Sequence, residues 1–215
     1  MRFGSFVDRR LAKLSPFFSF WQSVVDVSKR HFPWMSSSFA HPKAEVLHMD
    51  GFKYLKDNPE GFDVIITDAS DPIGPAESLF QKEYFGLLKA SLRPGGILCS
   101  QAECLWLHMN IISELVTFCR DMFPTVQVGY SSVPTYPCGQ LGFIMCCKGE
   151  TDLKKLARFV VLSHSFSRGD DLIFPPIHCR PVPTQIQDTL RYYHEDMHSA
   201  SFVLPHFARK VLDKK

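Results

Sequence analysis

The chain has 215 residues, a formal charge of +2 at neutral pH, 45% hydrophobic residues and 21% charged residues. This length can bury one hydrophobic core, so we expect one globular domain. The net charge is too small, and the lysines and arginines are too dispersed along the chain, to form a nucleic-acid or membrane surface. We expect neither partner. The seven cysteines are odd in number and lack a C-x-x-C spacing, which favours reduced thiols in the cytoplasm over disulfides or zinc.

The first third of the sequence alternates between helix and strand patterns. Apolar residues at three- and four-residue steps predict a helix from Leu14 to His31. A strand over Ala44 to Met49 and a short helix over Phe52 to Lys56 follow. The β-branched run from Phe62 to Thr67 is typical of a buried parallel strand.

The middle of the chain continues this alternation. A helix is predicted over Ser78 to Ser91, a strand over Ile97 to Gln101 and a helix over Trp106 to Phe123. Two strands, Val126 to Ser132 and Leu141 to Cys147, then follow each other without a helix, so they should pair antiparallel. The pattern as a whole predicts an α/β sheet with right-handed crossovers.

The C-terminal part is less regular. Residues 149–183 mix charges, prolines and serines without an apolar period, which predicts a loop excursion at the surface. Helices are predicted over Thr184 to Tyr193 and Ser201 to Leu212. His194 and His198 stand four residues apart, as helical metal ligands can, but no third ligand is evident and we expect no metal site.

The polar residues at the strand ends are the candidates for chemistry, because open α/β sheets bind ligands beyond the carboxyl ends of their strands. Asp50 ends the first predicted strand, Asp68 and Asp71 follow the second, and Gln101 ends the third. Two carboxylates without a neighbouring lysine or arginine would suit a cation, ideally an amine with two charged ends. The alternative is that these aspartates only form turns and helix caps.

Three segments resemble signature motifs of the spermidine synthases, the polyamine aminopropyltransferase family. They are DVIITDASDPIGPAESLF at 63–80, QAECLWLH at 101–108 and PTYPCGQLGF at 134–143. The ending from Tyr192 to Pro205 is similar to the family's tail. The resemblance covers residues 24–148 and again about 184–212.

The resemblance implies a Rossmann-like sheet of the class I methyltransferase kind. Residues 24–148 would be the C-terminal part of the catalytic domain, 149–183 a loop excursion and 184–215 a helical tail of the same domain. Residues 1–23 do not resemble the family, and the sequence contains no G-x-G-x-x-G. We therefore expect an N-terminally truncated or divergent form that lacks the family's N-terminal β-domain and first sheet strands, which would leave buried-type strands with unpaired edges.

The resemblance also implies roles for individual residues. Asp68 matches the family's catalytic acid, Asp71 the acid that holds putrescine, and Tyr136 and Gln101 the lining of the polyamine pocket. Asp50 matches the acid that reads the adenine of decarboxylated S-adenosylmethionine. The residues beside it on the co-substrate side are Gly51, Pro75, Ala76 and Leu79.

The implied function is aminopropyl transfer from decarboxylated S-adenosylmethionine, a co-substrate, to putrescine, with no further cofactor. An amine of pKa ~10 is protonated at neutral pH and must give its proton to a carboxylate before it attacks. The absence of the glycine-rich loop would impair the co-substrate half of the site. Two alternatives stay open, a putrescine N-methyltransferase and a non-catalytic form that binds polyamine or a subunit partner, and a homodimer is an option as in the family.

Overall fold

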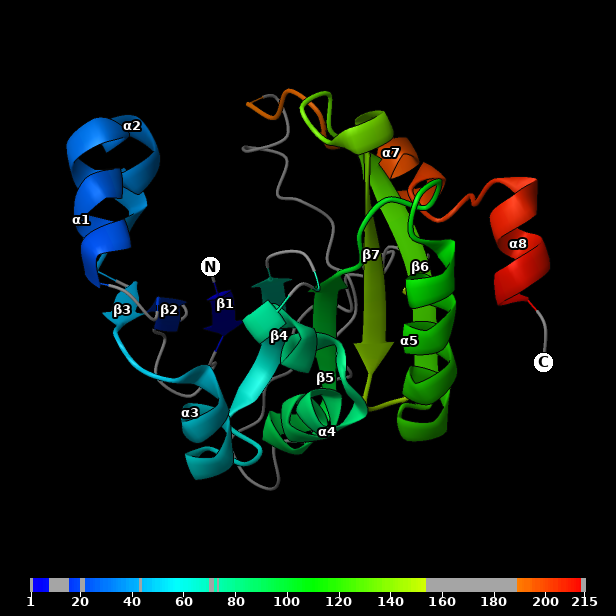
Figure 1. The fold of residues 1–215 in the computed structure, drawn as a ribbon, viewed down its shortest axis with the longest axis horizontal. Helices are drawn as coiled ribbons and strands as arrows, with labels where there is room; N and C mark the ends of the chain where they lie inside the picture. Colours follow the sequence, from blue (N-terminus) through cyan, green and yellow to red (C-terminus); the bar gives the residue numbers. More distant parts are fainter. Residues whose placement is uncertain are drawn as a thin grey trace, which may run out of the picture.

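A computed structural model describes residues 2–7, 16–19, 22–42, 44–69, 72, 74–153 and 189–213. These residues form a seven-stranded sheet of order β3-β2-β1-β4-β5-β7-β6 (Figure 1). The strands are β1 (Arg2–Val7), β2 (Pro16–Ser19), β3 (Glu45–Leu47), β4 (Phe62–Ala69), β5 (Leu92–Gln101), β6 (Thr125–Ser132) and β7 (Gln140–Cys147).

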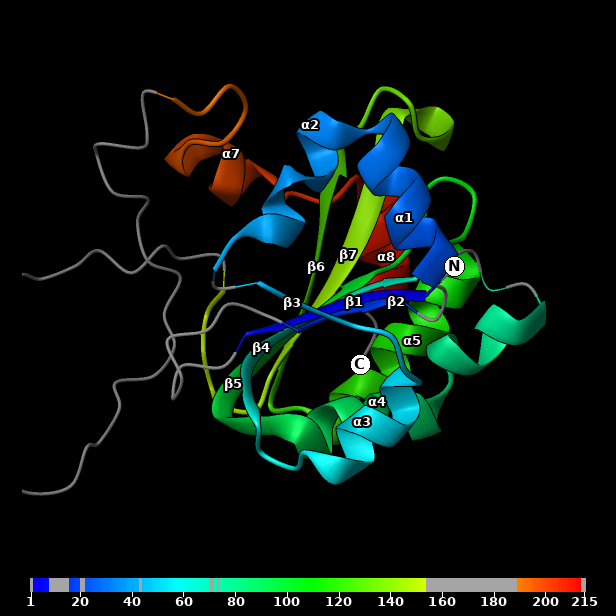
Figure 2. The ribbon, with the colours of Figure 1, turned by 90° about the vertical axis from the view of Figure 1, so that its left-hand side faces the viewer.

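Helices cover both faces of this sheet (Figure 2). In chain order, the helices before β5 are α1 (Gln22–His31), α2 (Pro33–Ser36), the 3-10 helix η1 (Ser37–Ala40), α3 (Gly51–Asp57), the 3-10 helix η2 (Gly74–Phe80) and α4 (Lys82–Ser91). The helices after β5 are α5 (Met109–Met122), the 3-10 helix η3 (Pro137–Gly139), α7 (Glu195–Ala200) and α8 (His206–Leu212). In Figure 2, α3, α4 and α5 lie below the sheet, and α1, α2 and α7 lie above it. No helix of the described ranges is long and apolar enough to cross a bilayer.

The strand directions bring the predicted site residues to one edge of the sheet. β4 pairs in parallel with β5, and β2 with β3. β1 runs antiparallel to its two neighbours, β2 and β4, so β2, β3, β4 and β5 all share one direction. Asp50, Asp68 and Gln101 therefore follow or end strands whose carboxyl ends lie along the same edge, where α/β proteins bind their ligands.

The α/β class and the antiparallel pairing of β6 with β7 are confirmed. The helix expected from Leu14 is wrong at its start, because Pro16–Ser19 is strand β2 and α1 begins only at Gln22. Phe17 and Phe18 pair with β1 on one side and with β3 on the other. Aromatic residues fit a pleated sheet well, and pairing on both sides outweighs the helical spacing of these residues.

Of the buried-type strands expected to have unpaired edges, β4 has this edge occupied in the structure. β1 pairs with residues 64–69 of β4, from Arg2 opposite Ala69 to Val7 opposite Val64. Residues 64–67 of β4 are thus paired on both sides, as a buried strand requires. This pairing could not be read from residues 1–23, since it depends on a partner that lies about 60 positions away.

Several predicted helix limits also change. The helix expected over Ser78 to Ser91 is divided into η2 and α4, and the one expected from Trp106 begins at Met109. The helix expected over Ser201 to Leu212 is confined to α8, which follows Pro205, a residue suited to helix starts because it has no N–H. Thr189 to Tyr193 are not helical. Residues 154–188, which hold most of the expected loop excursion, lie outside the described residues.

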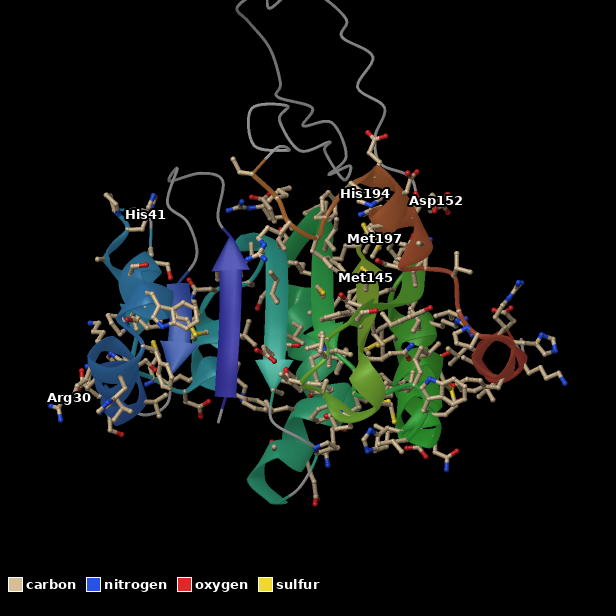
Figure 3. The ribbon with its side chains drawn as sticks, turned by 90° about the horizontal axis from the view of Figure 1, so that it is seen from above. Arg30, His41, Met145, Asp152, His194 and Met197 are labelled. Atoms are coloured by element: carbon tan, nitrogen blue, oxygen red, sulfur yellow. The ribbon has the colours of Figure 1, made fainter. Side chains whose placement is uncertain are left out.

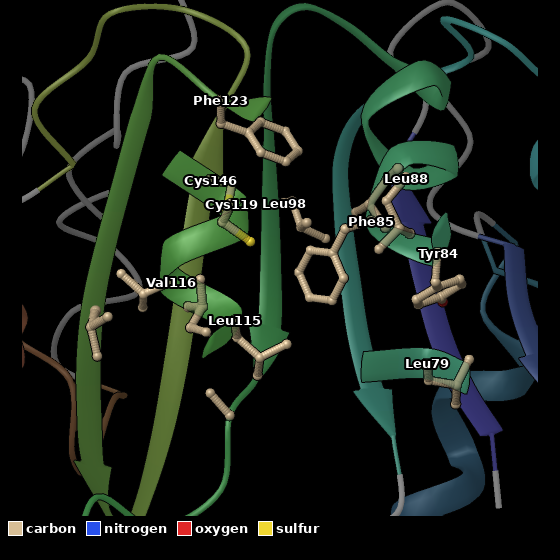
Figure 4. Packing of buried hydrophobic residues seen from close by; sticks show 14 of the residues in the cluster. Leu79, Tyr84, Phe85, Leu88, Leu98, Leu115, Val116, Cys119, Phe123 and Cys146 are labelled. Atoms are coloured by element: carbon tan, nitrogen blue, oxygen red, sulfur yellow. The ribbon is translucent and has the colours of Figure 1, made fainter. Parts of the chain in front are cut away.

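The core lies between the sheet and helices α4 and α5. Figure 4 shows Phe85 and Leu88 of α4 facing Leu98 of β5, with Leu115 of α5 alongside. Phe85 has no exposed surface, and its ring lies 5.2 Å from that of Phe118 in an edge-to-face arrangement. This packing fixes the two strands whose ends carry Asp68 and Gln101.

Helix α7 covers the other face, at the β6–β7 side of the sheet. Figure 3 shows His194, the N-cap of α7, and Met197 of α7 on the same side of the molecule as Met145 of β7. His198 has protein partners on both ring nitrogens, the Tyr193 hydroxyl at 3.2 Å and the Leu153 carbonyl at 3.1 Å. His194 accepts a hydrogen bond from the Met197 amide at the start of α7. Both histidines thus have structural partners, and the described part of the chain contains no group of three metal-ligating side chains.

We expect Phe85→Ala to lower the free energy of unfolding by about 3–5 kcal/mol, because it leaves a cavity in a fully buried position. Trp34→Ala is the matched control, since the Trp34 side chain is 75% exposed and its removal should change stability by less than about 0.5 kcal/mol. Urea unfolding followed by far-UV circular dichroism measures both. Equal losses would contradict the placement of the core.

Candidate active site

Asp68 lies at the end of β4, next to the end of β5. Thr67 is buried and donates a hydrogen bond from its hydroxyl to the Ser100 hydroxyl at 2.8 Å. Because Thr67 pairs with Ser100 in the parallel ladder, the next residues along, Asp68 and Gln101, come side by side. Side chains alternate along a strand, so this next pair projects from the opposite face of the sheet.

The surroundings of Asp68 raise the proton affinity of its carboxylate. Its side chain reaches solvent, but the packing around it removes part of the carboxylate's hydration and raises its pKa above the ordinary value of 3.8. A base accepts a proton more readily when its pKa lies closer to the working pH. Asp71, the other predicted carboxylate of this loop, lies outside the described residues.

Gln101 is the centre of a buried polar cluster. Its Nε2 donates hydrogen bonds to the Tyr136 hydroxyl at 2.9 Å and to Glu103 Oε1 at 3.0 Å. Gln101 and Glu103 are only 4% and 3% exposed. The structure therefore brings together Gln101 and Tyr136, as the resemblance implied, and adds Glu103 to them.

Glu103 was missed as a site residue in the sequence, although it lies within the motif at 101–108. The available signal was an acidic residue two positions beyond the end of a buried strand. Asp68, which directly follows the predicted strand Phe62 to Thr67, gives a similar signal, and a turn-forming role explains either residue equally well at the level of sequence. Only the burial of Glu103 and its contact with Gln101 distinguish it from a turn residue.

The cluster lacks one hydrogen-bond donor. Gln101 Oε1 is buried and has no hydrogen-bond partner. Buried polar atoms are nearly always paired, so an orphan acceptor at a strand end indicates a position for a ligand donor. Beside it, Glu103 supplies a carboxylate and Tyr136 a hydroxyl oxygen, both of which accept hydrogen bonds. Three acceptors, one of them a carboxylate, suit an ammonium group.

The co-substrate residues predicted from the resemblance lie on α3 and η2. Asp50 is the N-cap of α3, and its Oδ1 accepts a hydrogen bond from the Phe52 amide at 2.9 Å. Gly51 is the first residue of this helix, and the space where a Cβ would stand is open to 4 Å. On η2, Pro75 precedes Ala76 and Leu79, and these two side chains are each 6% exposed. Asp50 thus caps a helix, which is the structural role that the alternative to ligand binding predicts for it. Its second carboxylate oxygen remains available for a ligand.

The raised pKa of Asp68 predicts a definite effect on stability. The folded state binds this proton more tightly than the unfolded state, so ionised Asp68 costs folding free energy at neutral pH. That cost disappears below the ordinary value of 3.8, where both states are protonated. Asp68→Asn should therefore be more stable than the wild type at neutral pH, with a difference that shrinks as the pH falls through the raised pKa. Urea unfolding of both proteins across this range is the measurement, and a difference that does not depend on pH would contradict the assignment.

Comparison with known proteins places this geometry in a family. The family described as "Spermine/spermidine synthase domain" matches residues 19–155. Spermidine synthase of Schizosaccharomyces pombe is 44% identical over 194 residues, which is 90% of this chain and 58% of that protein. Spermidine synthase of Dictyostelium discoideum is 40% identical over 192 residues, or 89% of this chain and 60% of its own length. The chain thus spans less than two thirds of these relatives.

Solved structures show the same fold. A spermidine synthase in complex with the transition-state analogue AdoDATO superposes with a TM-score of 0.69 at 23% identity, covering 91% of this chain and 60% of that one. Spermidine synthase from Thermotoga maritima gives a TM-score of 0.66 at 22% identity, covering 91% and 59%. The match over 19–155 contains Asp68, Gln101, Glu103 and Tyr136. The chain belongs to the spermine/spermidine synthase family.

Proposed function

We propose that this chain carries the amine half of a spermidine synthase site and takes part in aminopropyl transfer from decarboxylated S-adenosylmethionine to putrescine. The observation that carries the proposal is the unpartnered acceptor Gln101 Oε1, buried next to the Glu103 carboxylate and beside the end of the strand that carries Asp68. Membership of the spermine/spermidine synthase family supports it.

The acceptor cluster would bind one ammonium group of putrescine. An ammonium has three N–H donors and no acceptor, and the cluster offers Gln101 Oε1, the Glu103 carboxylate and the Tyr136 hydroxyl. Asp71 is assigned to the same diamine by the resemblance alone. Burial of the cluster strengthens a charge-assisted hydrogen bond, because water does not compete for the ammonium there.

Asp68 would accept the proton that the attacking amine must lose. The amine nitrogen then forms a bond to the methylene carbon next to the sulfonium, and the carbon–sulfur bond breaks with its electron pair moving to sulfur. The positively charged sulfonium becomes a neutral thioether, so neither a metal ion nor a covalent enzyme intermediate is required. The protein's main contribution is to align the amine, carbon and sulfur and to hold the proton acceptor in reach.

The co-substrate half of the site is the weaker half in this chain. Asp50 and the wall formed by Ala76 and Leu79 are available for an adenine, but the sequence lacks the glycine-rich loop that lets backbone approach such a molecule in related folds. We therefore propose that the chain by itself binds the sulfonium donor weakly and turns over slowly.

A methyltransferase is the second candidate. Putrescine N-methyltransferase 3 of Nicotiana tabacum is 36% identical over 197 residues, covering 88% of this chain and 47% of that protein. Such an enzyme would use the same amine site and the same base. It would differ only in the carbon that the amine attacks, which would be a methyl carbon on sulfur instead of the aminopropyl methylene. A third possibility is a form that binds diamine without turnover.

Product analysis separates these functions. Purified chain is incubated with putrescine and either decarboxylated S-adenosylmethionine or S-adenosylmethionine, and the products are identified by mass spectrometry. We expect slow formation of spermidine from the first donor, lowered by a further ~10²–10⁴-fold in Asp68→Asn because the proton acceptor is lost. N-methylputrescine from the second donor would instead establish the methyltransferase. Diamine binding without either product would establish the silent form.

Glu103→Gln tests the amine site independently of turnover. Replacing the carboxylate by a neutral amide of similar shape removes a charge-assisted contact of about 1.5–3 kcal/mol, so calorimetry should show putrescine binding roughly 10- to 100-fold weaker. Glu114→Gln is the control, because Glu114 is an exposed glutamate on α5. Equal affinities of wild type and Glu103→Gln would exclude Glu103 from the site.

A further inference from the structure

We propose that Gly142 is a positioning residue for the amine site. Its lack of a side chain permits a β-bulge at the end of β5, and this bulge aims the Glu103 carboxylate at Gln101. The inference rests on the proposed diamine function and adds to it a backbone position that makes no contact with substrate.

The hydrogen bonds at the end of the β5–β7 ladder show the bulge. Regular pairing extends to Gln101 opposite Phe143. Beyond it, the Ala102 amide donates to the Gly142 carbonyl at 2.9 Å, whereas the Gly142 amide donates to the Glu103 carbonyl at 2.7 Å. Two residues on one strand thus face one residue on the other, which is the pattern of a β-bulge. Bulges next to active sites redirect side chains.

The bulge holds Glu103 in a backbone conformation that is rare for its residue type. Glu103 has a φ of +61°, in the left-handed region that residues with a Cβ seldom adopt. Such a conformation persists only where the surroundings enforce it. Here the short hydrogen bond from the Gly142 amide is one restraint, and burial of the Glu103 side chain is another.

Gly142 is the residue whose shape allows this arrangement. A Cβ at position 142 would stand 2.7 Å from the Glu103 carbonyl oxygen and 3.5 Å from that of Ala102. Contacts below 3.0 Å force a shift, and the atoms in question are backbone atoms that cannot rotate away. A side chain here would therefore displace Glu103 and break its hydrogen bond with Gly142.

The Glu103 carboxylate has little tolerance for such a displacement. Its Oε1 accepts from Gln101 at 3.0 Å, and its Oε2 lies 3.7 Å from His108 Nδ1. The same ring nitrogen of His108 accepts from the Cys104 amide at 3.4 Å. The carboxylate thus lies between Gln101 of β5 and His108, the residue that precedes α5. A backbone movement of about an ångström would remove the contact with Gln101, since hydrogen bonds end near 3.5 Å.

The test compares Gly142→Ala with Gly129→Ala. Gly129 is a matched control because it is buried in the neighbouring strand β6 and a Cβ there would also be crowded, at 3.1 Å from the Ser201 carbonyl oxygen, but away from Glu103. Calorimetry with putrescine should show binding roughly 10- to 100-fold weaker in Gly142→Ala, and near wild-type binding in Gly129→Ala. In the Glu103→Gln background, Gly142→Ala should cause no further loss, because the two changes remove the same contact. Additive losses, or unchanged binding in Gly142→Ala, would overturn the inference.

A second readout needs no ligand and separates this inference from the proposed function. The side-chain amide of Gln101 gives an NMR signal that should shift in Gly142→Ala as it does in Glu103→Ala, and should stay unchanged in Gly129→Ala. If this shift is seen but the wild type does not bind putrescine, the diamine function fails and the positioning stands. An unshifted signal in Gly142→Ala overturns the positioning. If Gly142→Ala does not fold, adding Glu103→Gly should restore folding, because glycine gives residue 103 the backbone freedom to move its carbonyl oxygen away from the new Cβ; failure to restore folding would place the strain elsewhere and overturn the inference.

Discussion

The parallel pairing of β4 with β5 is the constraint on which the candidate site depends. It places Thr67 opposite Ser100, joins their hydroxyls in a buried hydrogen bond, and so brings the next two residues, Asp68 and Gln101, side by side. Both strands are anchored from one face by Phe85 and its neighbours on α4 and α5. A change in this register by one residue would send one of the two candidate side chains to the other face of the sheet relative to its partner strand.

The pairing of β5 with β7 then refines the site. The regular ladder pairs Gln101 with Phe143 of β7, the strand that follows the loop carrying Tyr136, and the bulge opposite Gly142 turns Glu103 into the same cluster. Burial removes the hydration of these acceptors, and Gln101 Oε1 has no partner in the protein to replace it. Such an arrangement is reasonable where a ligand completes it, as an ammonium group would.

The two halves of the proposed site are unequally represented in this chain. The proposed amine half draws on the segments 63–80, 101–108 and 134–143, all within the family match. On the co-substrate side, Asp50 is engaged as a helix cap, and strands β1 and β2 pair beside β4 without a glycine-rich loop. The proposed chemistry is therefore best supported where it concerns the amine and its proton.

The sequence by itself determined the α/β class, the strands that end at Asp68 and Gln101, and the family. Local periodicity and long motifs carry this information, because each depends on neighbouring residues. The tertiary structure alone decided that Pro16–Ser19 is a strand, that β1 covers the edge of β4, and that Glu103 lies buried against Gln101. These features depend on pairing between segments far apart in the chain and on a bulge opposite Gly142, and neither is encoded in the spacing of residues along one segment.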